Sequence, residues 1–140
     1  EILATDLSTR ILERARETLW PVEKAREIPL HYLKAFMLRG TGSQEGRMKA
    51  GPELRPLVRF QRVNLNEEGY PVSGRFDLLF CRNVFIYFDA ASKARALGRL
   101  LGQHLAPQGY FFVGHAESLS SLAHRVRAVQ PTIYTALHPG

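Results

Sequence analysis

Polar side chains that could bind a ligand come directly after three apolar segments of this sequence. The three groups are Asp6 after residues 2–4, Asn64 with Leu65 at the end of residues 57–64, and Arg82 with Asn83 after residues 76–80. If the segments are parallel strands, their carboxyl ends meet at one edge of a sheet, where open α/β folds bind ligands. Together, the three strand ends predict a binding cleft.

Each of these side chains suits a different part of a ligand. A carboxylate such as Asp6 offers two oxygens to the hydroxyls of a ribose. The Asn64 amide can pair with donor and acceptor atoms of an adenine edge, while Leu65 covers the ring. The Arg82 guanidinium is a fixed fork of donors that suits a carboxylate, and Asn83 stands next to it.

Each residue also has a structural role open to it. Asp6 or Ser8 could cap the following helix, and Asn64 could be a turn residue. Arg82 could instead form an internal ion pair. The acids available for that pair are Asp77, Asp89 and Glu117.

Four further side chains have weaker claims to chemistry. Tyr87 lies between two apolar residues, where packing is the usual reason for a tyrosine. His115 and Glu117 follow another apolar segment and could suggest acid–base or metal chemistry. The five histidines lack metal-ligand spacing, so we predict no metal site. Cys81, at the end of a buried strand, is better explained as a small hydrophobe than as a nucleophile.

Composition limits the class of protein. The 140 residues are 45% apolar, enough for one domain with a core. The net charge of +6 would suit anionic partners, but the basic residues are scattered as on a solvated surface, so we expect no nucleic-acid binding. With one cysteine and no apolar run of about 20 residues, we expect a cytoplasmic protein without membrane insertion. Because a strand begins at Ile2 without a lead-in, we expect the C-terminal part of a larger protein.

Apolar periodicity and turn residues predict alternating strands and helices, hence an α/β fold with a doubly wound, mainly parallel sheet. Ser8 is the expected cap of a first helix, and Pro21 lies just beyond the end of its pattern. A shorter helix follows Pro29 with Leu30, Leu33 and Phe36 or Met37 inward. The remaining expected elements are a buried strand at 76–80, a helix from Asp89 to about 105, a strand at 109–115, a helix at 117–125 and two short strands at 126–137.

The glycine- and proline-rich segment from residue 39 to 62 breaks this alternation. It predicts a small antiparallel β insertion, assigned to residues 36–62, with strands near 36–39, 47–50 and 57–64. Residues 40–46 are its turn. The segment has neither repeats nor low complexity.

The motifs taken together resemble the C-terminal, S-adenosylmethionine-binding domain of the CheR family. The similar strings run along the whole chain: ILATDLSTRILERAR, FMLRGTGSQEG, VRFQRVNL, FDLLFCRNVFIYFD, LAPQGYFFVGHAESLS and TIYTAL. Members are Rossmann-like, class I methyltransferases that esterify glutamate side chains of bacterial chemoreceptors, leaving S-adenosylhomocysteine. The Cys-Arg-Asn-Val string with Gly-His-x-Glu-Ser downstream is the most specific part.

The resemblance implies a role for each candidate residue. Asp6 would bind the cofactor ribose, and Asn64 with Leu65 would contact the adenine. Arg82 and Asn83 would lie beside the methionine part and the methyl-transfer site, with Tyr87 close to the transferred methyl. Residues 36–60 would correspond to a β-subdomain that in some members adds a receptor tail peptide to its edge.

The family's N-terminal helical domain and first sheet strand, with its Gly-rich loop, have no counterpart before Glu1. That strand is central in the family, between the strands ending at Asp6 and Cys81. We therefore expect these residues alone to leave a gap in the sheet, open to strand exchange or aggregation, and to show little methyl transfer.

A sulfonium methyl and a glutamate carboxylate need positioning rather than a general base. Arg82 would orient a carboxylate, while Asn83 and Tyr87 would shape the methyl pocket. The Arg-Asn-Val string stands where nitrogen methyltransferases often carry Asn-Pro-Pro-Tyr, which favours oxygen as the acceptor. Two alternatives stay open: a receptor-binding module without catalysis, and a nucleic-acid methyltransferase on a related fold.

Overall fold

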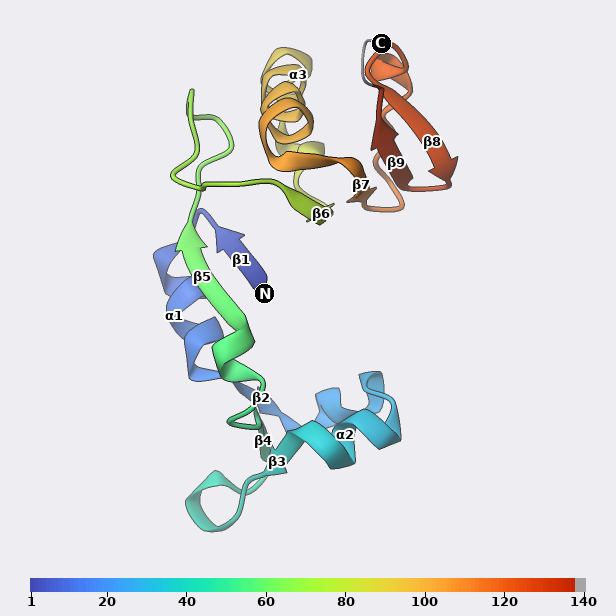
Figure 1. The fold of residues 1–140 in the computed structure, drawn as a ribbon. Helices are drawn as coiled ribbons and strands as arrows, with labels where there is room; N and C mark the ends of the chain where they lie inside the picture. Colours follow the sequence, from blue (N-terminus) through green and yellow to red (C-terminus); the bar gives the residue numbers. More distant parts are fainter. Residues whose placement is uncertain (138–140) are drawn as a thin grey trace. The chain divides into compact units, whose positions relative to one another are not determined.

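The computed structural model describes residues 1–137 and divides into two compact units, Glu1–Asn64 and Leu65–Gly140 (Figure 1). His138, one of the five histidines considered above, lies outside the described residues. The first unit contains β1 (Ile2–Asp6), α1 (Thr9–Glu17), β2 (Leu19–Pro21), α2 (Leu30–Phe36), β3 (Met37–Arg39), β4 (Arg47–Ala50) and β5 (Val58–Arg62). The second contains β6 (Phe76–Cys81), α3 (Ala90–Arg99), β7 (Leu105–Val113), β8 (Val126–Gln130) and β9 (Ile133–Ala136).

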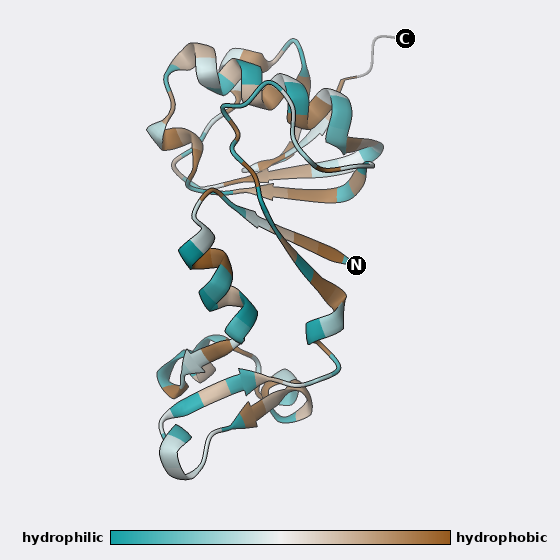
Figure 2. Ribbon diagram, turned by 90° about the vertical axis from the view of Figure 1, so that its left-hand side faces the viewer, coloured by the Kyte–Doolittle hydropathy of each residue, from teal (hydrophilic) through white to brown (hydrophobic). Residues whose placement is uncertain are grey.

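In the first unit, β1 and β5 form a parallel pair that runs from Ile2 opposite Val58 to Asp6 opposite Arg62. The predicted helix follows as α1, and Ser8 is its N-cap, accepting a hydrogen bond from the Ile11 N–H. Figure 2 shows the apolar, brown colour of β1 at the N-terminus and the mixed brown and teal turns of α1. This helix is amphipathic, and Leu12 is its buried residue.

A separate antiparallel sheet has the strand order β2-β4-β3. The expected strands near 36–39 and 47–50 are confirmed as β3 and β4. The strand expected at 57–64 was assigned the wrong partner, because β5 pairs with β1 instead. The third strand is β2, at the edge of this sheet. It contains Pro21, which indicated only the end of a helix in the sequence. Proline is tolerated in an edge strand because it lacks an N–H group, and an edge strand has N–H groups that need no partner strand.

Whether residues 36–62 form a separate subdomain stays a prediction. The inward positions predicted for α2 are partly wrong, because Leu30 is 62% exposed and Phe36 is also exposed. Leu33 and Met37 are half-buried. A helix of seven residues offers few positions to a core, and none of the residues of α2 is fully buried.

The second unit is built on a sheet with the order β6-β7-β9-β8, in which β6 and β7 are parallel and the other pairs are antiparallel. The mixed α/β class predicted from the sequence is confirmed. Residues of α3 pack on one face of β6 and β7 and form the core. Its most buried members include Leu97, Leu105, Phe111 and Leu119.

The other face of β6 is open, so the expectation of a fully buried strand is wrong. The side chain of Leu78 is 54% exposed and that of Phe80 is 62% exposed. Leu79 and Cys81 lie on the opposite face of the strand and pack against the core. Phe80 stacks on Phe112 of β7, with ring centroids 4.4 Å apart. The alternation of side chains along a strand explains the difference, because α3 covers just one side.

The helix predicted from Asp89 to about residue 105 is confirmed as α3 followed by a π-helical turn, Leu100–His104. The next strand begins earlier than the predicted residue 109, because β7 starts at Leu105. The helix expected at 117–125 is wrong: the segment holds a short 3₁₀ turn, Ser120–Leu122. The cause is local, because the Glu117 N–H closes a turn on the Gly114 carbonyl and its carboxylate binds other backbone groups.

No helix among the described residues is long and apolar enough to cross a membrane. In the same part of the chain, no three His, Cys, Asp or Glu side chains gather as metal ligands would.

Candidate functional site at the strand ends

The first unit brings Asp6 and Asn64 to the same end of its parallel pair. The Val63 N–H donates to the Asp6 carbonyl at 3.1 Å, which extends the β1–β5 ladder to its carboxyl end. Asn64 follows directly. The carboxyl ends of these neighbouring strands therefore lie side by side.

Asp6 is in a turn and does not cap the helix. Its Oδ1 accepts a hydrogen bond of 2.8 Å from the Ser8 N–H, whereas the Ser8 hydroxyl caps α1. This arrangement is an Asx-type turn, in which a short carboxylate binds the backbone two residues later. The turn fixes the carboxylate at the end of β1 and leaves the half-buried side chain at the surface of the unit.

Leu65 opens the second unit and packs half-buried against its core cluster. Its carbonyl accepts a hydrogen bond of 3.0 Å from the Tyr70 hydroxyl. The structure thus holds the backbone of Leu65 in place, while its predicted contact with an adenine ring stays a prediction.

In the second unit, Arg82, Asn83 and Tyr87 follow β6 and are all exposed. Tyr87 is 83% exposed, so packing does not account for it. None of the ion pairs among the described residues involves Arg82, so the internal pairs considered for it do not form. Its guanidinium is free to bind a ligand.

The backbone after β6 is held by Glu117, which lies beyond the end of the neighbouring strand β7. Glu117 Oε2 accepts from the N–H groups of Asn83 and Gly114, each at 2.7 Å. Its Oε1 accepts from the N–H groups of Val84 at 3.0 Å and Phe85 at 2.8 Å. The carboxylate therefore joins the ends of two parallel strands by four hydrogen bonds.

This carboxylate is buried, since Glu117 is 5% exposed. Burial by itself raises the pKa of Glu117, but the four backbone donors outweigh it and leave the pKa below its ordinary value. The group is thus an anion at neutral pH, with each oxygen shared between two N–H groups. Replacing an ion that accepts hydrogen bonds from four backbone N–H groups lowers the stability of the fold, because each N–H group would be left buried without a partner.

Two backbone details belong to the same arrangement. Asn83 has a φ of 58°, in the left-handed region that Asn tolerates better than most residues. A Cβ on Gly114 would lie closest to Asn83 Oδ1, and it would be 2.8 Å from Glu117 Oε2 and 3.1 Å from the Asn83 nitrogen. Gly114 is thus required by the close approach of the loops after β6 and β7.

Cys81 lies just before this loop, on the buried face of β6. Burial, with a smaller contribution from the negative charge of Glu117, raises the pKa of Cys81 to about 12. The thiol therefore stays protonated at neutral pH and cannot act as a nucleophile. This agrees with its interpretation as a small hydrophobe.

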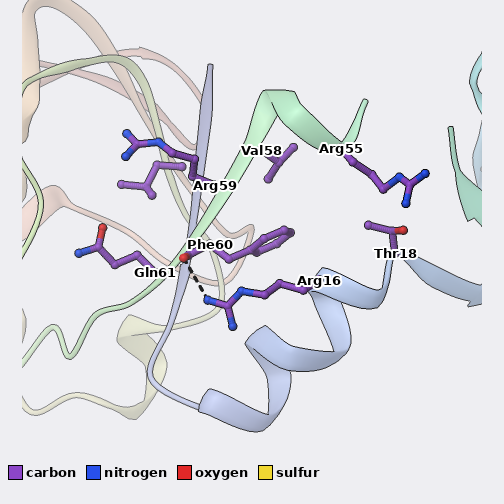
Figure 3. A pocket seen from close by; sticks show the side chains of 8 residues that line it. Arg16, Thr18, Arg55, Val58, Arg59, Phe60 and Gln61 are labelled. Atoms are coloured by element: carbon purple, nitrogen blue, oxygen red, sulfur yellow. Dashed lines mark hydrogen bonds between the residues drawn. The ribbon is translucent and has the colours of Figure 1, made fainter. Parts of the chain in front are cut away.

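Two surface hollows lie away from the predicted site residues. One, of about 460 Å³, is in the first unit beside the start of β5 and the end of α1 (Figure 3). Its arginines are partly engaged: Arg16 donates to the Phe60 carbonyl and lies over the Phe60 ring, and Arg59 pairs with Glu1. The other, of about 470 Å³, lies in the second unit beside α3 and β7. Neither one is lined by a predicted site residue.

The residue that sequence reasoning missed is Glu117. It was considered as an acid–base partner of His115 or an ion-pair partner of Arg82, and the structure gives it neither role. One signal could have found it. A lone acid in a turn after a buried strand, close to a glycine, is typical of a carboxylate that binds backbone N–H groups.

Comparison with known sequences places this arrangement in a family. Residues 1–135 match a family model described as "CheR methyltransferase, SAM binding domain". Chemotaxis protein methyltransferase 2 of Pseudomonas aeruginosa is 41% identical over 135 residues, which are 96% of this chain and 48% of that protein. The chemotaxis protein methyltransferases of Salmonella typhimurium and Escherichia coli are each 37% identical over 134 residues, 46% of their length.

The chain spans about half the length of the curated relatives it matches. The matches cover nearly all of its own sequence, including all three groups of strand-end residues. We conclude that this chain belongs to the CheR family, in the part that its description calls the S-adenosylmethionine-binding domain.

Proposed function

We propose that this chain contributes the cofactor-binding part of an enzyme that transfers a methyl group from S-adenosylmethionine to glutamate carboxylates of bacterial chemoreceptors. The observation that carries the proposal is Arg82, exposed and without an ion pair in the described residues, at the end of a strand. An arginine kept free beside an apolar strand has the chemistry to bind a ligand carboxylate.

The residues at the strand ends fit the cofactor. Asp6 has the carboxylate that a ribose diol needs, and Asn64 with Leu65 has the amide and the apolar cover that suit adenine. Arg82 and Asn83 would take the methionine part. When bound, the cofactor supplies an activated methyl group on a sulfonium.

The protein's own contribution is to bind and orient. Arg82 would orient a carboxylate, and the exposed Tyr87 would line the place where the substrate enters. No side chain has to remove a proton, because a glutamate carboxylate is already ionised near neutral pH. Holding the two reactants in line accounts for catalysis of this kind.

The partner would be the cytoplasmic domain of a chemoreceptor, and we expect the protein to act in the cytoplasm. Residues 36–60 could also bind the receptor's C-terminal tail peptide. Support comes from β3, an end strand of the β2-β4-β3 sheet, which has an edge where a peptide strand can add. Titration calorimetry with a receptor tail pentapeptide tests this, and the absence of heat would remove the tether role.

The proposal is tested by calorimetric binding of S-adenosylhomocysteine to the full-length gene product. We expect Arg82→Gln to weaken binding at least about tenfold, which corresponds to the loss of one charged hydrogen-bonding partner. Arg127→Gln is the matched control, because Arg127 is an exposed arginine of β8 and the change in charge is the same.

The outcomes separate the alternatives. Equal binding by Arg82→Gln and the unaltered protein would remove Arg82 from the site. A protein that binds receptor but neither S-adenosylmethionine nor its product would be a receptor-binding module. Salt-sensitive binding of RNA together with the cofactor would favour a nucleic-acid methyltransferase.

A further inference from the structure

The Glu117 carboxylate does more than fill a turn. It accepts four backbone hydrogen bonds, and three of the donors are the consecutive N–H groups of residues 83–85. The fourth donor is Gly114, at the end of the neighbouring strand β7. A loop that carries ligand-binding side chains would otherwise be free to move, because surface loops have few partners.

Arg82 and Asn83 project from this fixed backbone. Both side chains are exposed, and the next core anchor is Phe85, which is 3% exposed and packs edge-to-face on Phe88. Arg82 thus lies between buried Cys81 and the first N–H that Glu117 accepts. Its direction is set by the backbone on both sides rather than by a contact of its own.

We propose that Glu117 is a positioning residue of the cofactor site, holding the backbone of residues 83–85 against Gly114 so that Arg82 and Asn83 are oriented before the cofactor binds. The inference rests on the proposed function. Glu117 acts through the backbone and touches no ligand. It orders the loop in the free protein, which lowers the entropy that binding would otherwise cost.

Gly114 provides independent support for this role. The Asn83 side-chain oxygen, the Glu117 carboxylate and the Asn83 backbone nitrogen approach so closely that a Cβ at position 114 has no room. A carboxylate serving just its own turn would not require a glycine beside the loop after β6. The requirement comes from bringing the two loops together.

The first experiment compares Glu117→Gln with Glu67→Gln, an exposed glutamate of the same unit that undergoes the same change in charge. Glutamine keeps one acceptor oxygen and turns an amino group toward two N–H donors. We expect the Kd for S-adenosylhomocysteine to rise at least about tenfold in Glu117→Gln, as misplacement of a binding group does, and to stay unchanged in Glu67→Gln. Glu117→Asp should recover part of the affinity, because it keeps both oxygens.

The second experiment needs no substitution. Amide hydrogen exchange of residues 83–85 and 114 is measured in the full-length protein with and without S-adenosylhomocysteine. We expect these amides to be protected already in the free protein, with less than about tenfold further slowing on binding. This result would stand even if Glu117→Gln did not fold.

Two results would overturn the inference and leave the proposed function standing. One is a folded Glu117→Gln variant that binds S-adenosylhomocysteine as tightly as the unaltered protein. The other is a set of amides at residues 83–85 that become protected only when S-adenosylhomocysteine binds. Failure of the unaltered protein to bind S-adenosylhomocysteine would overturn the proposed function, and the inference with it. The exchange pattern of the free protein distinguishes the cases, because it reports the loop without any ligand.

Discussion

The strand ends of the two units are fixed in different ways. In the first unit, Asp6 is held locally, by one hydrogen bond to the Ser8 N–H two residues later. In the second unit, the loop after β6 is held by Glu117, which is more than 30 residues further along the chain and accepts four backbone hydrogen bonds. The strand end of the first unit therefore depends on a turn, and that of the second unit on a buried ion.

The comparison teaches where rigidity comes from. A local turn needs just the correct residues in sequence and can form before the rest of the fold. The four hydrogen bonds of the buried carboxylate can form only when β6 and β7 are already paired, so they depend on the tertiary structure. Its loss also leaves several donors buried without partners, whereas the loss of the turn leaves one.

The largest expected effect follows directly. We expect Glu117→Ala to lower the free energy of unfolding by about 2–4 kcal/mol, because it leaves several buried N–H groups without a hydrogen-bond acceptor. Asp6→Ala should lower it by about 1 kcal/mol or less, because one N–H group loses its acceptor. Urea denaturation of both variants provides the measurement. Equal losses in the two variants would contradict the difference between the units.

Gly114→Ala disturbs the same contact between the loops after β6 and β7, from the side of the loop after β7. The new Cβ would press on Glu117 and Asn83, and we expect a loss of about 1–3 kcal/mol by overpacking. Gly69→Ala is the control, since a Cβ there meets nothing within 4 Å and the backbone φ is ordinary. If both substitutions leave the melting temperature unchanged, the loops do not approach as closely as described.

Asn83 allows the backbone role to be separated from a binding role. Asn83 has a φ of 58°, in the left-handed region that glycine adopts without strain. Asn83→Ala should therefore lower the free energy of unfolding by about 1 kcal/mol more than Asn83→Gly does. If Asn83 also binds the cofactor, both variants weaken S-adenosylhomocysteine binding. Normal binding by Asn83→Gly would mean that Asn serves the backbone alone.

The smallest effect is a dependence on pH. Because the folded protein lowers the pKa of Glu117, its contribution to stability is complete above the ordinary glutamate value of about 4.3 and is lost as the pH falls through the folded pKa. The stability difference between the unaltered protein and Glu117→Gln should therefore shrink below about pH 4. Urea titrations from pH 7 to pH 3 measure it, and a constant difference would be inconsistent with an ionised Glu117.

Much of the fold could be predicted because its signals are local. Ser8 was predicted as a cap, and the apolar runs predicted β1, β6 and β7. Pairing was harder, since β5 has the pattern of any half-buried strand and each of its partners in β1 lies 56 residues earlier in the sequence. Pro21 indicated a helix end, although the chain uses it in an edge strand.

The sequence by itself determined the class of fold, the family and the residues that stand at the strand ends, because these depend on residue type, periodicity and order. Tertiary structure alone decided which face of β6 is covered, that Arg82 has no ion pair in the described residues, and that Glu117 binds the backbone of another loop. The physical reason is that burial and buried hydrogen bonds are properties of pairs of segments. No single stretch of sequence contains both partners.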